Sequence, residues 1–163
     1  MGKIFIFDID DTIIIHTPEY NDYYTPDKNN KTLLELINTL DSEANYAYTN
    51  GTYEHGDSVM KALNLKHTIK KIFARDTVPH MKPLLESFQY VHNEIIKENH
   101  QLMNEYYFFD DLIENLKSSK KVGWKTVWIS PNYAQYKNYM DIIDYAFPNI
   151  YQALMYFNKK MYY

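Results

Sequence analysis

Short apolar runs alternate along the chain with longer segments of helical period, and this alternation constrains the fold more than any other feature. The apolar runs are too short for helices, whereas the segments between them carry apolar residues at three- and four-residue spacing. Strands that alternate with helices are typical of βα units, in which helices cover both faces of a parallel sheet. We therefore predict an α/β fold, a Rossmann-like three-layer αβα sandwich with a central parallel sheet.

The pattern also predicts where the elements lie. The expected strands are Lys3–Phe7, Asn45–Thr49, Ile72–Ala74, Glu105–Phe109, Thr126–Ile129 and Tyr145–Phe147. Five helices are expected. The first begins at Thr25-Pro26 and includes Leu33 to Leu40, and the second is Asp57–Leu63. The third begins at Pro83 and has Leu85, Phe88, Val91, Ile95 and Ile96 on one face; the fourth is Ile113–Lys121, and the fifth is the tyrosine-rich tail from Tyr151.

Length and composition exclude several classes of protein. The chain of 163 residues predicts a single domain, 1–163, and no apolar run reaches the length that a bilayer requires. There are no cysteines, which excludes disulfides and thiol chemistry, and no secretory signal opens the sequence, so we expect a cytoplasmic protein. The net charge of −4, with Arg75 as the only arginine, disfavours a nucleic-acid partner without excluding one, and no membrane partner is expected.

Polar residues gather where the predicted strands end. In parallel sheets, ligands bind in the crevice outside the carboxyl ends of the strands. The residues expected there are Asp8, Asp10 and Thr12, then Thr49, Asn50 and Gly51, then Lys82, and finally Asp110 and Asp111. The sequence thus predicts one pocket that is rich in carboxylates and hydrogen-bond donors.

Converging carboxylates repel one another and need a cation or protons to neutralise them. Mg²⁺ suits such a site, because it takes oxygen ligands and relies on a few carboxylates together with water and substrate phosphate. In phosphoryl transfer, one acid can attack phosphorus, a second can exchange a proton with the leaving oxygen and water, and others can hold the metal. Hydroxyl, amide and lysine donors can bind the oxygens of the transferring phosphoryl group.

Four ordered motifs resemble those of the haloacid dehalogenase-like (HAD) hydrolases. "DIDDT" from Asp8 to Thr12 matches D-x-D-x-T, and Thr49 in "YAYTNG" resembles the second motif. Lys82 in "KPLLESF" resembles the third motif, and "FFDDLIEN" resembles the fourth. The fourth motif has the form D-D-x-x-x-N, which is similar to that of the pyrimidine nucleotidase-like and magnesium-dependent phosphatase-like branches. The resemblance extends over 3–129 and implies an HAD-like fold.

The resemblance also implies the role of each residue. Asp8 is the expected nucleophile, which forms an aspartyl-phosphate, and Asp10 the expected general acid/base. The implied Mg²⁺ ligands are Asp8, Asp10 through its backbone carbonyl, Asp110 and Asp111. The implied phosphate-binding residues are Thr12, Thr49, Asn50, Gly51 and Lys82. The expected activity is a magnesium-dependent phosphomonoesterase that acts on a nucleotide or another small phosphorylated metabolite.

Neither 13–44 nor 51–80 has room for a sizeable cap domain, which in many of these hydrolases selects the substrate. Capless relatives tend to act on macromolecular phosphates or to use a neighbouring subunit as a lid. Two alternatives therefore stay open: a phosphatase of phosphoprotein or nucleic-acid 3′-phosphate ends, and a catalytically silent metal- or phosphate-binding module. A homo-oligomer is a further expectation.

Other residues near the motifs allow two interpretations. The flap residues His16, Tyr20, Tyr23 and Tyr24 either cover the pocket or pack as ordinary core and surface side chains. Tyr53, His55 and His80 either rim the site or lie in polar loops. Asp11 is expected to be structural, and Asn115 either supports the site or lies on a helix surface.

Overall fold

The computed structural model describes residues 2–16, 31–99 and 104–161. Within these ranges, six parallel strands form one sheet in the order β3-β2-β1-β4-β5-β6. The strands are β1 (Lys3–Phe7), β2 (Ala44–Tyr48), β3 (Lys71–Phe73), β4 (Glu105–Asp110), β5 (Lys125–Ile129) and β6 (Tyr145–Phe147). All six predicted strands are present, with ends that differ by one residue at most.

The described part of the chain has five α-helices, of which four connect strands and the fifth follows β6. They are α1 (Lys31–Asn38), α2 (Tyr53–Ala62), α3 (Leu85–Asn99), α4 (Ile113–Lys121) and α5 (Ile150–Met161). Helix α2 begins four residues before the predicted start, because Thr52 caps its N-terminus. The 3₁₀ helix η1 (Tyr133–Tyr139) was not predicted, and none of its residues is buried. The expected helix start at Thr25-Pro26 and the flap tyrosines Tyr20, Tyr23 and Tyr24 lie outside the described residues.

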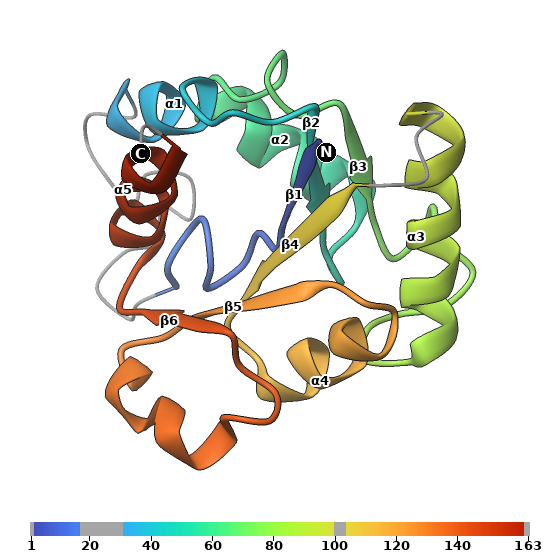
Figure 1. Ribbon diagram of the computed structural model, residues 1–163. Helices are drawn as coiled ribbons and strands as arrows, with labels where there is room; N and C mark the ends of the chain where they lie inside the picture. The colour runs from blue at the N-terminus through green and yellow to red at the C-terminus, as the bar shows by residue number, and fades with distance from the viewer. Residues whose placement is uncertain (1, 17–30, 100–103, 162–163) are drawn as a thin grey trace.

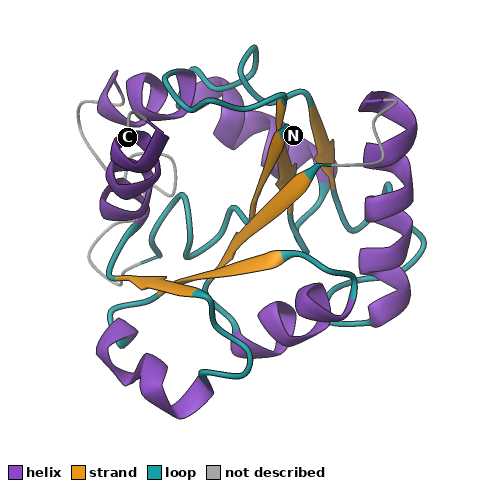
Figure 2. Ribbon diagram, viewed as in Figure 1, coloured by secondary structure: helices purple, strands orange, loops and turns teal. Residues whose placement is uncertain are grey.

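Alternating side chains of β1 show why helices cover both faces of the sheet. Phe5 and Phe7 belong to one core cluster, to which α1, α2 and α5 contribute, whereas Ile4 and Ile6 belong to a second cluster with α3 and α4. Figure 1 shows α1 and α5 on one side of the sheet and α3 on the other, and Figure 2 shows the strands between these helical layers. The predicted three-layer αβα sandwich is confirmed.

The strand order changes direction at β1, and this determines where a site can form. From β1 the chain adds β2 and then β3 on one side, and it returns to add β4, β5 and β6 on the other. A crevice forms outside the carboxyl ends of the strands at such a switch point. The chain between β2 and β3 forms α2 and short loops, so no cap is inserted there. No helix of the described residues is long and apolar enough to cross a membrane.

Candidate active site

Asp8 and Asp110 lie side by side at the switch point because β1 and β4 are paired. Phe7 is in register with Phe109, and the Asp8 amide donates a hydrogen bond to the Phe109 carbonyl over 2.9 Å. Asp8 follows β1 directly, and Asp110 is the last residue of β4. The sheet itself therefore brings together two carboxylates that are far apart in sequence.

Lys82 neutralises part of this charge from the loop before α3. Its Nζ donates to Asp8 Oδ1 over 3.0 Å, to Asp110 Oδ2 over 3.1 Å and to the Tyr48 carbonyl over 2.8 Å. The lysine side chain is 1% exposed. An ammonium group so deeply buried is stable only when paired, and all three of its protons find acceptors.

The loop after β1 holds Asp8 from the other side. The buried Thr12 hydroxyl donates to Asp8 Oδ2 over 2.9 Å. The amides of 12–14 all donate to the Ile9 carbonyl, which closes a tight turn. Asp11 has a positive φ of 60°, and its Oδ1 accepts a hydrogen bond from the His16 amide over 3.0 Å. Aspartate tolerates this conformation better than most residues, so the contacts of Asp11 agree with its expected structural role.

Asp110 is held by the start of α4. Its Oδ1 accepts from the Leu112 amide over 2.8 Å, and its Oδ2 accepts from Asn115 Nδ2 over 3.1 Å. Asn115 is buried, so it supports the site and does not lie on the helix surface. Asp111 follows at the edge of the cluster, and oxygens of Asp8, Asp110 and Asp111 lie within 4.8 Å of one another.

The crowding of these groups shifts their pKa values. Burial and the charge of Asp110 raise the pKa of Asp8 to about 6, although Lys82 opposes the shift. Burial and the charges of Asp110 and Asp8 raise the pKa of Asp111 to about 9. Burial alone would lower the pKa of Lys82, but the charges of Asp110 and Asp8 outweigh it and raise that pKa. The cluster thus holds more negative charge than Lys82 can neutralise.

Asn50 connects the end of β2 to Lys82. Its Nδ2 donates to the Lys82 carbonyl over 2.9 Å, and its Oδ1 accepts from the Lys82 amide over 3.0 Å. The Gly51 amide donates to Thr49 Oγ1 over 3.0 Å. The side chain of Asn50 thus fixes the backbone of Lys82. The backbone amide of Asn50 is a separate group, and it is the one expected to bind phosphate.

Asp10 lies outside the buried cluster and contacts two histidines. His16 Nε2 is 2.7 Å and His55 Nε2 2.9 Å from the same oxygen, Asp10 Oδ1. The sequence analysis left open whether His16 and His55 lie at the pocket, and it predicted neither of these contacts. Thr52 is the sequence signal that could have located His55, because threonine is a favoured N-cap residue. Its hydroxyl accepts a hydrogen bond from the His55 amide and places His55 in the first turn of α2.

A hollow of about 220 Å³ opens at this edge of the sheet. Its lining residues are Asp8, Asp10, Asp11, Thr49, Asn50, Gly51, Lys82, Asp111, Leu112 and Asn115. Thr12 and Asp110 are fully buried and lie behind this lining, in contact with Asp8 and Lys82. The structure therefore brings every predicted site residue to one place, with Thr12 and Asp110 behind the lining.

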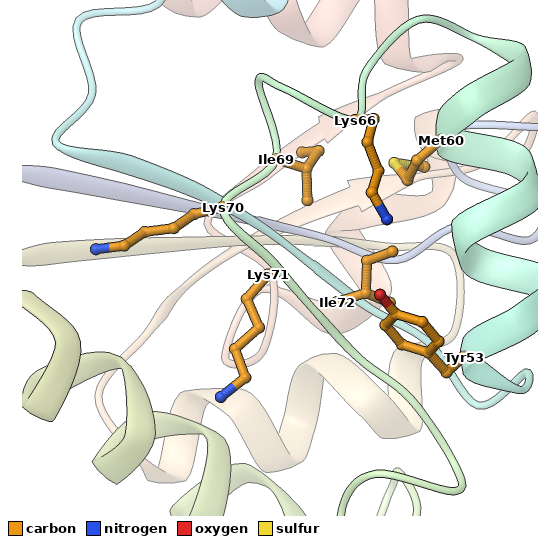
Figure 3. A pocket seen from close by; sticks show the side chains of 7 residues that line it. All are labelled: Tyr53, Met60, Lys66, Ile69, Lys70, Lys71 and Ile72. Atoms are coloured by element: carbon orange, nitrogen blue, oxygen red, sulfur yellow. The ribbon is translucent and has the colours of Figure 1, made fainter.

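A second hollow of similar size lies between α2 and β3 and contains three lysines. In Figure 3, Lys70 and Lys71 point in different directions, and Lys66 points towards Tyr53. Lys66 pairs with Asp57, and Lys71 pairs with Glu98 over 3.3 Å. Lys70 donates to Asn99 Oδ1 over 3.3 Å. Because two of the three charges are paired with carboxylates and the lysines point in different directions, this hollow does not form a concentrated anion site.

The carboxylate cluster fits a divalent metal by its chemistry. The three oxygen donors of Asp8, Asp110 and Asp111 lie close enough to share one ion. The raised pKa values of Asp8 and Asp111 show that, without an added cation, the cluster favours protons. Hard oxygen ligands with surplus negative charge are the donor set that Mg²⁺ prefers.

Comparison with solved structures identifies the fold. No family model and no curated protein matches the sequence. Among solved structures, a HAD-superfamily hydrolase from Ehrlichia chaffeensis is 19% identical with a TM-score of 0.58, and the match covers 80% of this chain and 58% of that one. YfnB from Bacillus subtilis, assigned as a HAD hydrolase and solved bound to magnesium, is 16% identical with a TM-score of 0.67 and coverage of 96% and 99%. The chain has the HAD fold.

Another HAD-fold match is a protein from Haemophilus somnus that is predicted to be a phosphoglycolate phosphatase. It is 16% identical with a TM-score of 0.58, and the match covers 78% of this chain and 55% of that one. The chain thus spans somewhat more than half the length of the Ehrlichia and Haemophilus proteins. At these identities the similarity establishes the fold, and the chemistry must be argued from the site.

Proposed function

We propose that the protein is a magnesium-dependent phosphomonoesterase that acts through an aspartyl-phosphate on Asp8, with a nucleotide or another small phosphorylated metabolite as its substrate. The observation that carries this proposal is the position of Asp8. It lies at the hollow, Lys82 and Thr12 fix its two oxygens, and Asp10 lines the same hollow. A carboxylate oxygen keeps a free lone pair after accepting one hydrogen bond, so Asp8 can still attack phosphorus.

The proposed reaction has two steps. In the first, an Asp8 oxygen forms a bond to phosphorus while the bond from phosphorus to the ester oxygen breaks, and Asp10 gives its proton to the leaving oxygen. In the second, Asp10 takes a proton from water, the water oxygen bonds to phosphorus, and the bond to Asp8 breaks. Inorganic phosphate leaves, and both aspartates return to their initial state.

Asp8, Asp110, Asp111 and the backbone carbonyl of Asp10 would hold the metal. A bound Mg²⁺ supplies positive charge that offsets the carboxylates and the phosphoryl oxygens. Lys82 adds a fixed positive charge beside the nucleophile, and the Asn50 backbone amide adds a donor for the phosphoryl oxygens, whereas the Gly51 amide donates to Thr49 Oγ1. The side chain of Thr49, which lines the hollow, completes the proposed phosphate-binding set, and Thr12 supports it from behind through its hydrogen bond to Asp8.

Two of the matched structures support this choice of chemistry. YfnB was solved with magnesium, and the Haemophilus protein is a predicted phosphoglycolate phosphatase. Both share the fold that places a carboxyl-end crevice beside β1 and β4.

A second candidate is a phosphatase of phosphate groups on macromolecules. Leu112 lines the hollow and is 54% exposed, and Leu84, two residues after Lys82, is 53% exposed. Apolar side chains beside an open site can contact the chain that carries a phosphate, or a second subunit of this protein. Light scattering distinguishes these cases, because a subunit that covers the site requires a homo-oligomer.

A substrate panel tests the proposal. Wild-type protein with Mg²⁺ should release phosphate from nucleotides or sugar phosphates faster than from phosphopeptides or 3′-phosphorylated DNA. The matched control is Asp8→Asn, which keeps the size of the side chain and should release none. Preference for a phosphopeptide or DNA would favour the second candidate. Magnesium binding without any phosphate release would instead identify a silent binding module.

A further inference from the structure

We infer that His16 and His55 are positioning residues for Asp10: together they hold its Oδ1, so that Oδ2 exchanges the proton with the leaving group and with water. This inference rests on the proposed function and assigns the orientation of its general acid/base. It is carried by the two contacts to one oxygen and by the place of the other oxygen at the hollow.

The two histidines reach Asp10 from different parts of the fold. His16 belongs to the loop after β1, and His55 to the first turn of α2 after β2. Their Nε2 atoms lie 2.7 and 2.9 Å from Asp10 Oδ1, and all three side chains are about two-thirds buried or more, at 27–32% exposed. An aspartate alone at the end of a loop can take several rotamers, whereas contacts from two directions select one.

The backbone of each histidine is itself anchored. The His55 amide donates to Thr52 Oγ1 over 3.2 Å, and the neighbouring Tyr53 amide donates to Asp76 Oδ1 over 2.8 Å. The His16 amide donates to Asp11 Oδ1. These bonds fix both imidazoles relative to the strand ends, and this gives Asp10 a rigid support.

Gly51 keeps the other oxygen of Asp10 accessible. A Cβ atom at Gly51 would lie 3.6 Å from Asp10 Oδ2 and 3.1 Å from His55 Cδ2. Asp10 and Gly51 both line the hollow, and we infer that Oδ2, the oxygen on the Gly51 side, is the one that faces it. The histidines therefore hold Oδ1 of Asp10 in place, and Oδ2 is the oxygen left for proton transfer.

The hydrogen-bonding capacity of a carboxylate gives Oδ1 and Oδ2 different roles. An ionised carboxylate only accepts hydrogen bonds, so each imidazole presents Nε2–H to Oδ1. With two N–H groups already on Oδ1, a proton taken up by Asp10 goes to Oδ2. From there it can pass to the leaving oxygen, and Oδ2 can later take a proton from water.

Paired substitutions at each histidine test the inference. His16→Leu and His55→Leu remove the N–H donor, and His16→Gln and His55→Gln restore one through the amide. The leucine variants should lower kcat on an alkyl phosphate by up to about 10²-fold, the effect of a misplaced catalytic group, with KM little changed. The loss should be much smaller on an aryl phosphate, whose leaving group needs little protonation. The glutamine variants should recover most of the activity.

The Asp10→Asn background separates positioning from a general structural effect. If the histidines act through Asp10, their removal should cost no further activity in that background. The exposed His67, which lies in the loop between α2 and β3, gives the control His67→Leu with wild-type kinetics. Equal losses on alkyl and aryl phosphates, or a full further loss in the Asp10→Asn background, would overturn the inference.

A wild-type protein that hydrolyses none of the phosphates refutes the proposed function instead. The inference would then be tested by NMR of the imidazole N–H protons, since two protected Nε2–H signals should disappear together in Asp10→Ala. Signals unaffected by Asp10→Ala would exclude a positioning contact even in an inactive protein.

Discussion

Asp8 and Asp10 are two residues apart, yet the protein surrounds them very differently. Asp8 is buried with Asp110 and Lys82, beside Asp111, in a cluster whose carboxylates outnumber its one cation. Asp10 is 32% exposed, and its partners are two imidazoles. The first environment concentrates negative charge, and the second holds one carboxylate oxygen between two imidazoles. The short loop after β1 therefore places two aspartates in different surroundings, and this difference underlies the separate roles that we propose for them.

The largest expected effect comes from the buried member of this pair. Asp8→Asn removes the proposed nucleophile, because an amide cannot form the acyl phosphate, so phosphate release should fall to the rate in buffer alone. The side chain keeps its size, and its amide oxygen can still accept from Lys82. Steady-state assays with Mg²⁺, with thermal unfolding as a control for folding, measure this. Turnover above a few per cent of the wild-type rate would contradict the assignment of Asp8, and not Asp10, as the nucleophile.

Asp10→Asn should have a smaller effect, because it removes proton transfer and leaves the nucleophile. The expected loss on an alkyl phosphate is about 10²- to 10⁴-fold, the usual contribution of a positioned acid/base. An aryl phosphate should show a smaller deficit in the first step. Single-turnover kinetics on both esters measure the two values, and equal deficits would show that Asp10 does more than transfer protons.

Lys82→Met tests the charge balance of the buried cluster through stability. The substitution keeps much of the side-chain length but leaves Asp8 and Asp110 buried without their cation, so unfolding free energy at pH 7 should fall by about 3–5 kcal/mol. Urea unfolding measures it, and Mg²⁺ should restore part of the loss by binding the folded state. The exposed Lys137→Met is the matched control, with a change within about 0.5 kcal/mol. A loss of similar size in both variants would mean that the buried pairing contributes little.

The pH dependence of the metal-free protein concerns Asp111. The pKa of Asp111 is raised from the ordinary 3.8 to about 9, mainly by burial. Between these values the folded protein binds more protons than the unfolded chain, so the free energy of unfolding falls as pH rises. The raised pKa of Asp8, about 6, adds to this fall only at the lower end of the range.

Asp111→Asn should therefore flatten the stability profile between about pH 6 and pH 9. Magnesium should favour the ionised Asp111 and release its proton, so the binding heat should depend on the ionisation enthalpy of the buffer. Thermal unfolding over this pH range and titration calorimetry in two buffers measure these effects. A metal-free protein that gains stability from pH 6 to pH 9 would contradict the crowding of carboxylates.

The fold and the place of the site were predictable because both depend on local pattern. Apolar runs such as Lys3–Phe7 indicated parallel strands, and residues just after such strands must meet at one edge of the sheet. Asp8, Lys82 and Asp110 could therefore be placed together from sequence.

The contacts within the site depend on side-chain directions that no periodicity encodes. The Asn50 clamp on the backbone of Lys82 and the two histidines on Asp10 Oδ1 both require the final loop geometry. The 3₁₀ helix η1 was missed for a related reason: none of its seven residues is buried, and tyrosines at every third position are too short a run to indicate a helix.

Rapid-quench mass spectrometry of Asp10→Asn with an aryl phosphate and Mg²⁺ tests the central claim most directly. The good leaving group should allow Asp8 to be phosphorylated, and the missing base should slow hydrolysis of the aspartyl-phosphate. A phosphate label on the peptide that contains Asp8, absent from the Asp8→Asn, Asp10→Asn double variant, is the predicted result. A label on another residue, or turnover of the aryl phosphate with no covalent intermediate, would contradict the assignment of Asp8 as nucleophile and Asp10 as acid/base.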